Sequence, residues 1–287
     1  GRTPNPDVLC NRQIKFGVLR AYSRRLGAPL LATGHYARLE SRSGRPVVLK
    51  ARDRSKDQSY FLHAVRGEDF DNVLFPVGDY LKSEVRDLAR DADLPVADKK
   101  DSTGICFIGE RPFDEFLSRY VPRNPGPIRT PEGGVLGTHH GLAFYTLGQR
   151  HGLILGGRKG FGEDPWYVAA KVPEENALIV VQGRDHELLL QNWLRATDVH
   201  WISAVPEWRA HGTFRCTAKT RYRQPDVACT VSRLGDAEIE VLFDAPQRAV
   251  TPGQYVVLYD GAQCLGGATI VCSALLESLR ETAVQAQ

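Results

Sequence analysis

The chain has 287 residues and a formal net charge of +3, and its hydrophobic (42%) and charged (25%) fractions are those of an ordinary globular protein. Because this length exceeds what one hydrophobic core usually holds, we expect two or three domains. No apolar run approaches the ~20 residues of a membrane span, and the first residues contain no signal-peptide core, so we expect a cytoplasmic protein without membrane contact.

The first region, residues 1–103, has the pattern of the later part of a nucleotide-binding α/β domain. Apolar residues recur at helical spacing over 11–26, and a short buried strand follows that ends at Gly34 and His35. Open α/β sheets place their ligands at this end of their strands. A hairpin is expected over 37–50.

The rest of the chain is expected to form two further domains and a tail. Glycine, proline and histidine are frequent over 104–190, which indicates a small connecting domain with long loops. Short alternating strands such as 227–231 follow over 191–279, and Asp260-Gly261 is typical of a hairpin turn. Strands at this spacing predict a small closed β-barrel, followed by a polar tail over 280–287.

A candidate reactive thiol stands early in the chain, in the string T-P-N-P-D-V-L-C-N over 3–11. We expect Cys10 to lie just before the helix over 11–26, where the helix dipole favours the thiolate. Asp7, three residues earlier, is a candidate proton carrier. The alternative is a buried cysteine after a proline turn.

A second candidate thiol, Cys106, lies in K-K-D-S-T-G-I-C-F-I-G-E-R over 99–111. Neighbouring cations lower a thiol pKa, and the flanking glycines allow close approach of the backbone. Cys10 and Cys106 could therefore meet as a redox pair, although a plain apolar role for Cys106 stays open. The remaining four cysteines fit core positions, and no C-x-x-C pair supports a metal site: Cys216, Cys229, Cys264 and Cys272.

A basic and aromatic string, R-C-T-A-K-T-R-Y-R-Q over 215–224, is a candidate phosphate-contacting strand with Tyr222 as a stacking group. On an extended strand, alternate side chains share one face, which would align four cations: Arg215, Lys219, Arg221 and Arg223. A solvated basic strand is the alternative. Lys56-Asp57-Gln58 forms another polar cluster that periodicity does not explain.

Together these strings resemble one family, the tRNA-specific 2-thiouridylases (the MnmA family). The similar strings occur in family order from Gly1 to about Gly267: GRTPNPDVLCN, LLATGHY, DRSKDQSYFL, LFPVGDYLK, KDSTGICFIGER, TLGQRHGL, DPWYV, TAKTRYRQ and TPGQ. The resemblance implies an α/β plus β fold: a partial Rossmann-like sheet of the adenine nucleotide alpha hydrolase type, a small central domain and a C-terminal β-barrel.

The resemblance also implies an activity and its partners. Such an enzyme adenylates the 2-carbonyl of the wobble uridine of tRNA with ATP and Mg²⁺, and a cysteine persulfide then supplies sulfur to give 2-thiouridine, AMP and pyrophosphate. Its partners would be the tRNA anticodon stem-loop and a sulfur-relay donor protein. A flipped-out target base is what enzymes acting on bases generally require.

By the same resemblance, Cys106 would hold the persulfide, Cys10 would close a disulfide with it, and Asp7 would be the general acid/base. Gly34 would approach ATP. Asn5, Pro6 and Asp7 would touch the target base, and the remaining tRNA contacts would be His35, Lys56, Asp57, Gln58, Arg221, Tyr222 and Gln254.

One departure from the family pattern is large. The Ser-Gly-Gly-x-Asp-Ser loop that cradles the ATP pyrophosphate appears nowhere, the chain opens on Gly1, and it contains no methionine. We expect this loop to lie upstream, so that the chain as given lacks most of its ATP-binding apparatus. A catalytically inactive tRNA-binding remnant is therefore the alternative, and a dithiol oxidoreductase using Cys10 and Cys106 is a third reading.

Overall fold

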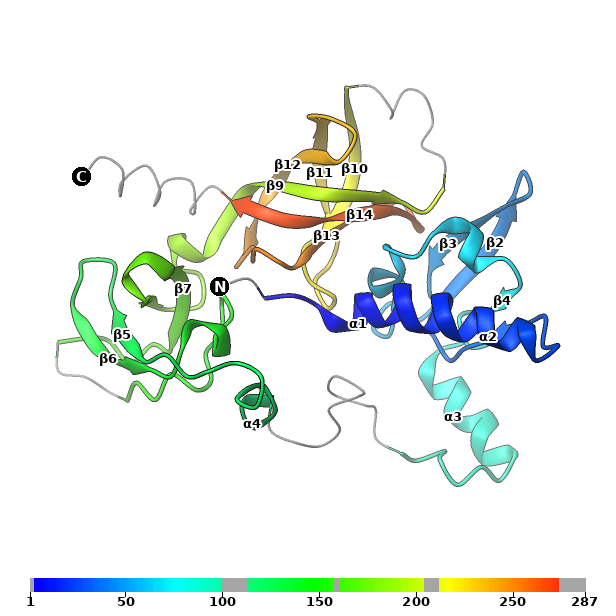
Figure 1. Ribbon diagram of the computed structural model, residues 1–287, viewed down its shortest axis with the longest axis horizontal. Helices are drawn as coiled ribbons and strands as arrows, with labels where there is room; N and C mark the ends of the chain where they lie inside the picture. The colour runs from blue at the N-terminus through cyan, green and yellow to red at the C-terminus, as the bar shows by residue number, and fades with distance from the viewer. Residues whose placement is uncertain (1–2, 100–112, 157–159, 204–211, 274–287) are drawn as a thin grey trace.

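The structure is a computed structural model, and it describes residues 3–99, 113–156, 160–203 and 212–273. Three bodies follow one another along the chain: a first region of helices and short strands, a central sheet, and a β-barrel (Figure 1). The N-terminal segment runs beside the barrel before it enters the first helix.

The first helix begins earlier than the sequence pattern predicts. It starts at Pro6 and runs without a break through α1 (Pro6–Leu9), a π-helical stretch (Cys10–Leu19) and α2 (Arg20–Arg25). Asn5 is the N-cap and Pro6 the first helical residue, where its missing N–H costs nothing. The apolar spacing over 11–26 therefore located the helix but not its start.

Short strands and helices complete the first region. The strand expected here is reduced to β1 (Leu31–Ala32), which pairs in parallel with β4 (Val73–Leu74), and the prediction that it is buried is wrong, because Leu31 is half-buried and Ala32 exposed. The expected hairpin is confirmed, with β2 antiparallel to β3. The remaining bounds are β2 (Ala37–Arg42), β3 (Arg45–Lys50), the 3-10 turns Ser59–Leu62 and Gly67–Phe70, and α3 (Lys82–Asp91).

The central body is a four-stranded sheet in the order β6-β5-β8-β7, in which only β5 and β8 are parallel. Ile128, Val168 and Leu178 fill its core because alternate strand residues face the same side. Its elements are α4 (Phe113–Leu117), β5 (Gly126–Arg129), β6 (Val135–His139), β7 (Trp166–Val172), β8 (Ala177–Gln182) and the 3-10 turns Leu142–Phe144 and Pro173–Glu175.

The last body is a closed barrel, as the sequence predicts. Six strands pair in the order β13-β10-β11-β12-β9-β14, and pairing of β13 with β14 closes the ring. The predicted turn at Asp260-Gly261 joins those two strands. The bounds are a 3-10 turn (Glu187–Leu189), β9 (Leu190–Trp201), β10 (Thr213–Lys219), β11 (Val227–Arg233), β12 (Glu238–Arg248), β13 (Tyr255–Asp260) and β14 (Gln263–Ser273).

The first region packs against the outside of this barrel. Strand β3 pairs with β14 at Leu49 and Gln263, and Tyr259 of β13 shares a buried cluster with Tyr60 and Leu62. At this junction Lys50 Nζ lies 2.8 Å from Asp226 Oδ2. The two bodies are thus joined by an apolar core and by an ion pair whose Lys50 side chain is buried.

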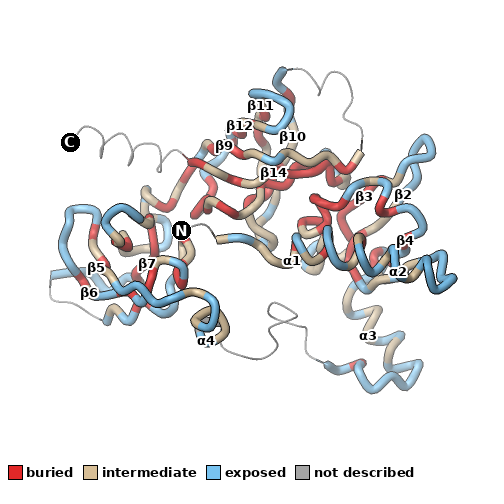
Figure 2. Tube along the Cα trace, viewed as in Figure 1, coloured by how far each residue is buried: buried red, intermediate tan, exposed pale blue. Residues whose placement is uncertain are grey.

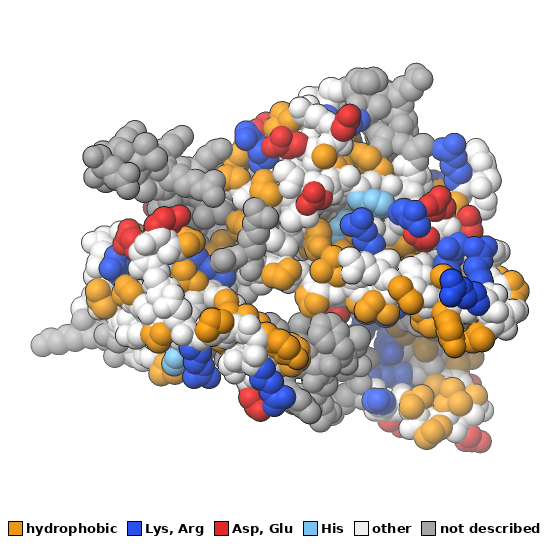
Figure 3. Space-filling model, in the orientation of Figure 1, with side chains coloured by type: hydrophobic (Ala, Val, Ile, Leu, Met, Phe, Trp, Pro, Cys, Tyr) orange, Lys and Arg blue, Asp and Glu red, His pale blue; other side chains and the backbone are white. Residues whose placement is uncertain are grey.

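Burial is unequal between the bodies (Figure 2). The barrel strands carry a continuous buried core, whereas the first helix exposes an apolar side that is visible in Figure 3. The exposed large residues of that helix are Leu9, Ile14, Val18, Leu19 and Tyr22. Among the described residues, every helix is too short or too polar to cross a bilayer.

Candidate functional site

The loop that precedes the first helix is held by the barrel. Thr3 donates its backbone N–H to Pro252 O at 3.2 Å, and the Gln254 side chain donates to Thr3 O at 2.6 Å. Asn5 then accepts the backbone N–H of Asp7 at 3.1 Å, which fixes the first turn. The structure thus brings Gln254 to the start of the loop that carries Asn5 and Asp7, although the three are far apart in sequence.

Asp7 and Cys10 differ in their position on the helix. Burial raises the pKa of the Asp7 carboxyl, and the charge of Lys15 offsets part of this rise. Asp7 lies in the first turn, whereas Cys10 lies four residues beyond the first helical residue. The expectation that Cys10 stands just before the helix is therefore wrong, and since the dipole effect fades within the first turn, it acts on Asp7 instead.

His35 lies inside the protein, in contact with the same helix. Its Nε2 is 3.1 Å from Asn11 Oδ1, and its Nδ1 is 2.8 Å from the Thr33 hydroxyl. Because Asn11 Nδ2 donates to Phe61 O, its Oδ1 is left as an acceptor, so His35 Nε2 donates and Nδ1 accepts. Burial, with a smaller contribution from Lys15, lowers the pKa of His35 to about 4. A neutral His35 therefore fixes Asn11, the neighbour of Cys10.

The Lys56-Asp57-Gln58 cluster has two internal members. Asp57 is only 5% exposed and accepts from the backbone of Ala51 at 3.0 Å and from the hydroxyl of Ser59 at 2.9 Å. Gln58 accepts the backbone N–H of Tyr36 at 3.0 Å. Both side chains shape the turn that presents Lys56.

Arg221 and Tyr222 also make internal contacts. Arg221 donates to the carbonyls of Leu147 and Ala249 at 2.5 and 3.1 Å, and burial lowers its pKa. It thereby ties the barrel to the central sheet. The Tyr222 ring lies 4.4 Å from that of Phe61, and its hydroxyl is 3.4 Å from Lys56 O, so the structure does bring the two predicted clusters together.

The predicted basic face over 215–224 does not form as one surface, because β10 ends at Lys219 and the chain then turns. Arg215 is paired with Asp244, and Lys219 is buried beside Asp57. Arg223 alone of the four expected cations is exposed outside an ion pair within the described ranges.

A cavity of about 470 Å³ opens beside Arg223, at the junction of the first region and the barrel. Two exposed guanidinium groups, those of Arg54 and Arg223, belong to its lining. The full lining is Lys50, Arg54, Lys219, Arg223, Gln224, Pro225 and Asp226. This set of side chains suits an anion.

Gly34 follows β1 at the carboxyl end of the parallel pair, as the sequence predicts. Its backbone is exposed, and a Cβ placed there would meet nothing within 4 Å, so a ligand can approach closely. The Ser-Gly-Gly-x-Asp-Ser string occurs nowhere among these 287 residues. Cys106 lies outside the described residues, so its distance from Cys10 is not part of the structure.

Sequence reasoning missed three residues at this site. Thr3 anchors the loop before the first helix to Gln254. The Phe61 carbonyl accepts from Asn11, and its ring packs on Tyr222. Lys171 of β7 lies with its Nζ 3.5 Å from the Thr3 hydroxyl. Burial lowers the pKa of Lys171 to about 8. Thr3 and Phe61 stood within strings that the resemblance used, but nothing in the sequence around Lys171 indicated a contact with residue 3.

Three family models match the chain, one for each body. Residues 1–110 match the tRNA methyl transferase HUP domain, 114–182 the tRNA methyl transferase PRC-barrel domain, and 191–270 the aminomethyltransferase beta-barrel domain. The fold therefore defines a three-domain protein of the HUP, PRC-barrel and β-barrel class, which confirms the predicted fold class.

Curated relatives narrow this class. A protein of Methylobacillus flagellatus is 54% identical over 275 residues, which cover 96% of this chain and 75% of the relative. Proteins of Xanthomonas oryzae pv. oryzae (53% identical, 95% of this chain, 71% of the relative) and Burkholderia multivorans (54%, 96% and 71%) match equally well. All three are named tRNA-specific 2-thiouridylase MnmA. The chain belongs to the MnmA family of tRNA-specific 2-thiouridylases.

Proposed function

We propose that this chain is a tRNA sulfurtransferase that converts the wobble uridine to 2-thiouridine. The observation that carries the proposal is its 54% identity, over 96% of its length, to a relative named for that activity. Family models match all three bodies, and these matches support the proposal. They include the region that carries Asp7 and Cys10 and the barrel that holds the loop before them. A sulfur-donor protein and a cytoplasmic location remain predictions.

The sulfur step would fall to two thiols. ATP with Mg²⁺ would supply the activation of the uridine 2-oxygen by adenylation, releasing pyrophosphate and later AMP. The terminal sulfur of a Cys106 persulfide would form the new bond to uridine C2, and Cys10 would bond to the remaining Cys106 sulfur. The S–S bond of the persulfide breaks as the Cys10–Cys106 disulfide forms, so sulfur and electrons balance.

Asp7 would carry the proton at the target base, next to Asn5 and Pro6. A carboxyl with a raised pKa holds a proton more readily near neutral pH, which suits a general acid. The loop that carries these residues is anchored at Thr3 by Gln254. We expect the target base to lie against this loop, with Lys56, Tyr222 and Gln254 on the tRNA side.

We further assign the phosphate contacts to Arg54 and Arg223. Both guanidinium groups are exposed beside the cavity at the junction, whereas Arg221 donates inward to two carbonyls. Contacts of His35, Asp57, Gln58 and Arg221 with tRNA stay predictions, and their internal hydrogen bonds support a role in holding the contacting turns.

Thiolation is tested in a bacterium that lacks its own 2-thiouridine synthesis. The coding region with its upstream sequence is expressed, and 2-thiouridine in tRNA is measured by mass spectrometry. We expect restoration, its loss in Cys106→Ser and Cys10→Ser, and its retention in the matched control Cys216→Ser. Retained thiolation in Cys106→Ser would remove the persulfide assignment, and tRNA binding without thiolation by the parent protein would favour a binding remnant.

Phosphate contact is tested by the salt dependence of tRNA binding. Each of Arg54→Ala and Arg223→Ala should lower the slope of log K against log[salt] by about one unit or slightly less. Arg221→Ala should leave the slope near that of the parent while lowering the thermal midpoint. A reduced slope in Arg221→Ala alone would place the phosphate at Arg221 instead.

A further inference from the structure

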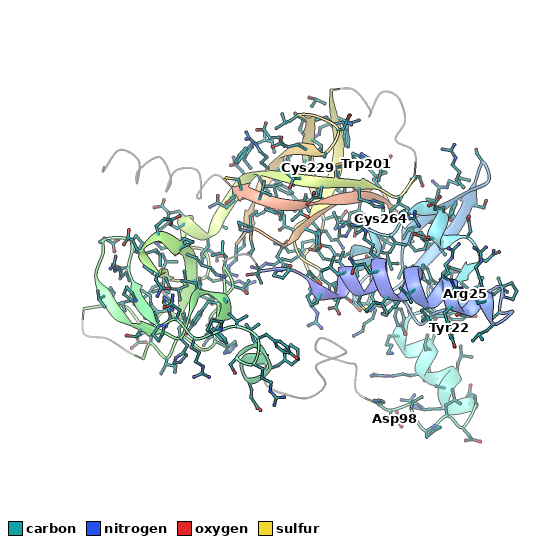
Figure 4. All side chains as sticks on the ribbon, in the orientation of Figure 1. Tyr22, Arg25, Asp98, Trp201, Cys229 and Cys264 are labelled. Atoms are coloured by element: carbon teal, nitrogen blue, oxygen red, sulfur yellow. The ribbon has the colours of Figure 1, made fainter. Side chains whose placement is uncertain are left out.

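A pair of cysteines in the barrel lies outside the proposed sulfur-transfer site. Cys216 of β10 and Cys229 of β11 are directly opposite in the antiparallel register, and their sulfur atoms are 3.6 Å apart. Cys229, labelled in Figure 4, belongs to the barrel core, whereas Cys264 belongs to the cluster between the barrel and the first region. The structure contains no disulfide between them.

We propose that Cys216 and Cys229 form a second redox site, which closes to a disulfide when the protein meets a hydroperoxide. Opposite residues of antiparallel strands have Cα atoms ~4.5–5.5 Å apart, inside the ~4.4–6.8 Å range that disulfides span. The sulfur atoms need only rotate toward each other, from 3.6 Å to bonding distance, without movement of either strand.

The two thiols differ in their access to solvent, which gives each a separate part in the reaction. Cys216 is half-buried and can meet an oxidant, whereas Cys229 is fully buried. The Cys216 thiolate attacks the peroxide oxygen, the O–O bond breaks, and a sulfenic acid forms with release of an alcohol or water. The Cys229 thiol then attacks that sulfur, the S–S bond forms, and water leaves. Two thiols are oxidised and one peroxide is reduced.

A disulfide between Cys216 and Cys229 would join the two strands that carry the turn assigned to tRNA contact. Cys216 and Cys229 lie on β10 and β11, the two strands that are joined by the turn carrying Arg221, Tyr222 and Arg223. Two further register pairs separate the cysteines from the turn, so a disulfide between them would close a covalent ring over residues 216–229 and limit how far β10 and β11 can part. Oxidation would therefore act on the surface that we assign to tRNA while leaving Cys10 and Cys106 chemically separate.

Other described cysteines lack these features. Burial raises the pKa of Cys264 strongly, and its thiol lies 3.9 Å from the backbone carbonyl oxygen of Ser59. Cys272 is buried in β14 beside the carbonyl of Ser273. They serve as internal controls for oxidation.

The test is peptide mapping of the whole protein after exposure to hydrogen peroxide, followed by alkylation under denaturing, non-reducing conditions. Trypsin cleaves after Arg215, Lys219, Arg223 and Arg233, so the two cysteines fall in separate peptides. We expect peptides 216–219 and 224–233 to appear joined and lighter by two hydrogens, with loss of both alkylatable thiols, while Cys264 and Cys272 remain alkylatable.

A Cys10→Ala variant, with Cys106→Ser in the same chain, should give the same linked peptide, because the pair is independent of the sulfur-transfer thiols. Cys216→Ser should abolish the link. The proposal is overturned if Cys216 and Cys229 both stay alkylatable at a peroxide dose that oxidises Cys10, or if Cys216 links only to another cysteine. Neither result bears on thiolation activity, so the two proposals fail separately.

Discussion

The first helix and the barrel bury their apolar residues to different extents. The barrel strands enclose a core in which Leu194, Val241 and Leu258 are fully buried. In contrast, Val18 of the first helix is 70% exposed, and α2 contains no buried residue. The continuous helix over 6–25 contacts the rest of the protein through its buried Val8, Asn11 and Phe16, and Phe16 packs on Phe70 and His35.

This difference teaches how the two regions gain stability. A closed ring leaves no unpaired strand edge and buries the inner side of every strand. A two-stranded parallel sheet has few partners of its own, so the first region depends on the outer side of β13 and β14 for its core. The loop that precedes the first helix is thus attached at Thr3 to the barrel and continues into the less buried body.

The largest effect should come from Gly266→Ala, which breaks the barrel itself. Gly266 has φ +146°, and a Cβ there would lie 2.0 Å from the carbonyl oxygen of His200. Since that oxygen belongs to the backbone of the paired strand β9, it cannot move aside alone, so β14 must separate from β9 and we expect loss of soluble folded protein by circular dichroism. Gly235→Ala, which meets open space, is the control. A folded Gly266→Ala protein would show that closure is not what holds this body.

A truncation in the barrel core should have the second-largest effect on stability. Leu258→Ala removes a fully buried side chain and should lower the free energy of unfolding by about 2–5 kcal/mol, measured by urea denaturation. Leu242→Ala, on an outward-facing side chain that is 51% exposed, is its matched control and should cost far less. Equal losses would mean that the barrel core is not densely packed.

Lowering the pH should reduce the stability of the first region and of its junction with the barrel. Burial holds the pKa of His63 and His35 at about 4, below their ordinary value of 6.5. The unfolded chain binds these protons at a higher pH than the folded protein does. The stabilisation that each neutral histidine gives the folded protein is therefore complete above pH 6.5 and is lost as pH falls toward 4. The loss should be about 3 kcal/mol for each histidine.

The measurement is the free energy of unfolding between pH 7.5 and pH 4, for the parent and for His63→Gln. The variant should have a shallower profile than the parent, whereas His140→Gln, at an exposed site, should not. A parallel profile in His63→Gln would exclude His63 as the source of the pH dependence.

The smallest effect should come from the exposed side of the first helix. Val18→Ala should change the free energy of unfolding by no more than about 0.5 kcal/mol, since the side chain has little burial to lose. A loss comparable to that of Leu258→Ala would contradict the contrast between the two regions, because it would require this side to be covered.

Much of the fold could be predicted from local patterns in the sequence. Alternation over 227–231 and the Asp260-Gly261 turn located barrel strands, and the pattern over 37–50 located a hairpin, because strand period and turn geometry are set by near neighbours. The apolar spacing also located the first helix. Its start was missed because the Asn5 cap and Pro6 are polar or rigid residues outside the apolar pattern.

The sequence alone determined which residue types this protein has for sulfur chemistry and tRNA contact, and family resemblance supplied their roles. Only the tertiary structure decided which of them face outward. Arg221 and Asp57 turn into the junctions, Arg54 and Arg223 face solvent, and Lys171 reaches Thr3. The physical reason is that burial and charge pairing depend on contacts between segments far apart in the chain, which no local period encodes.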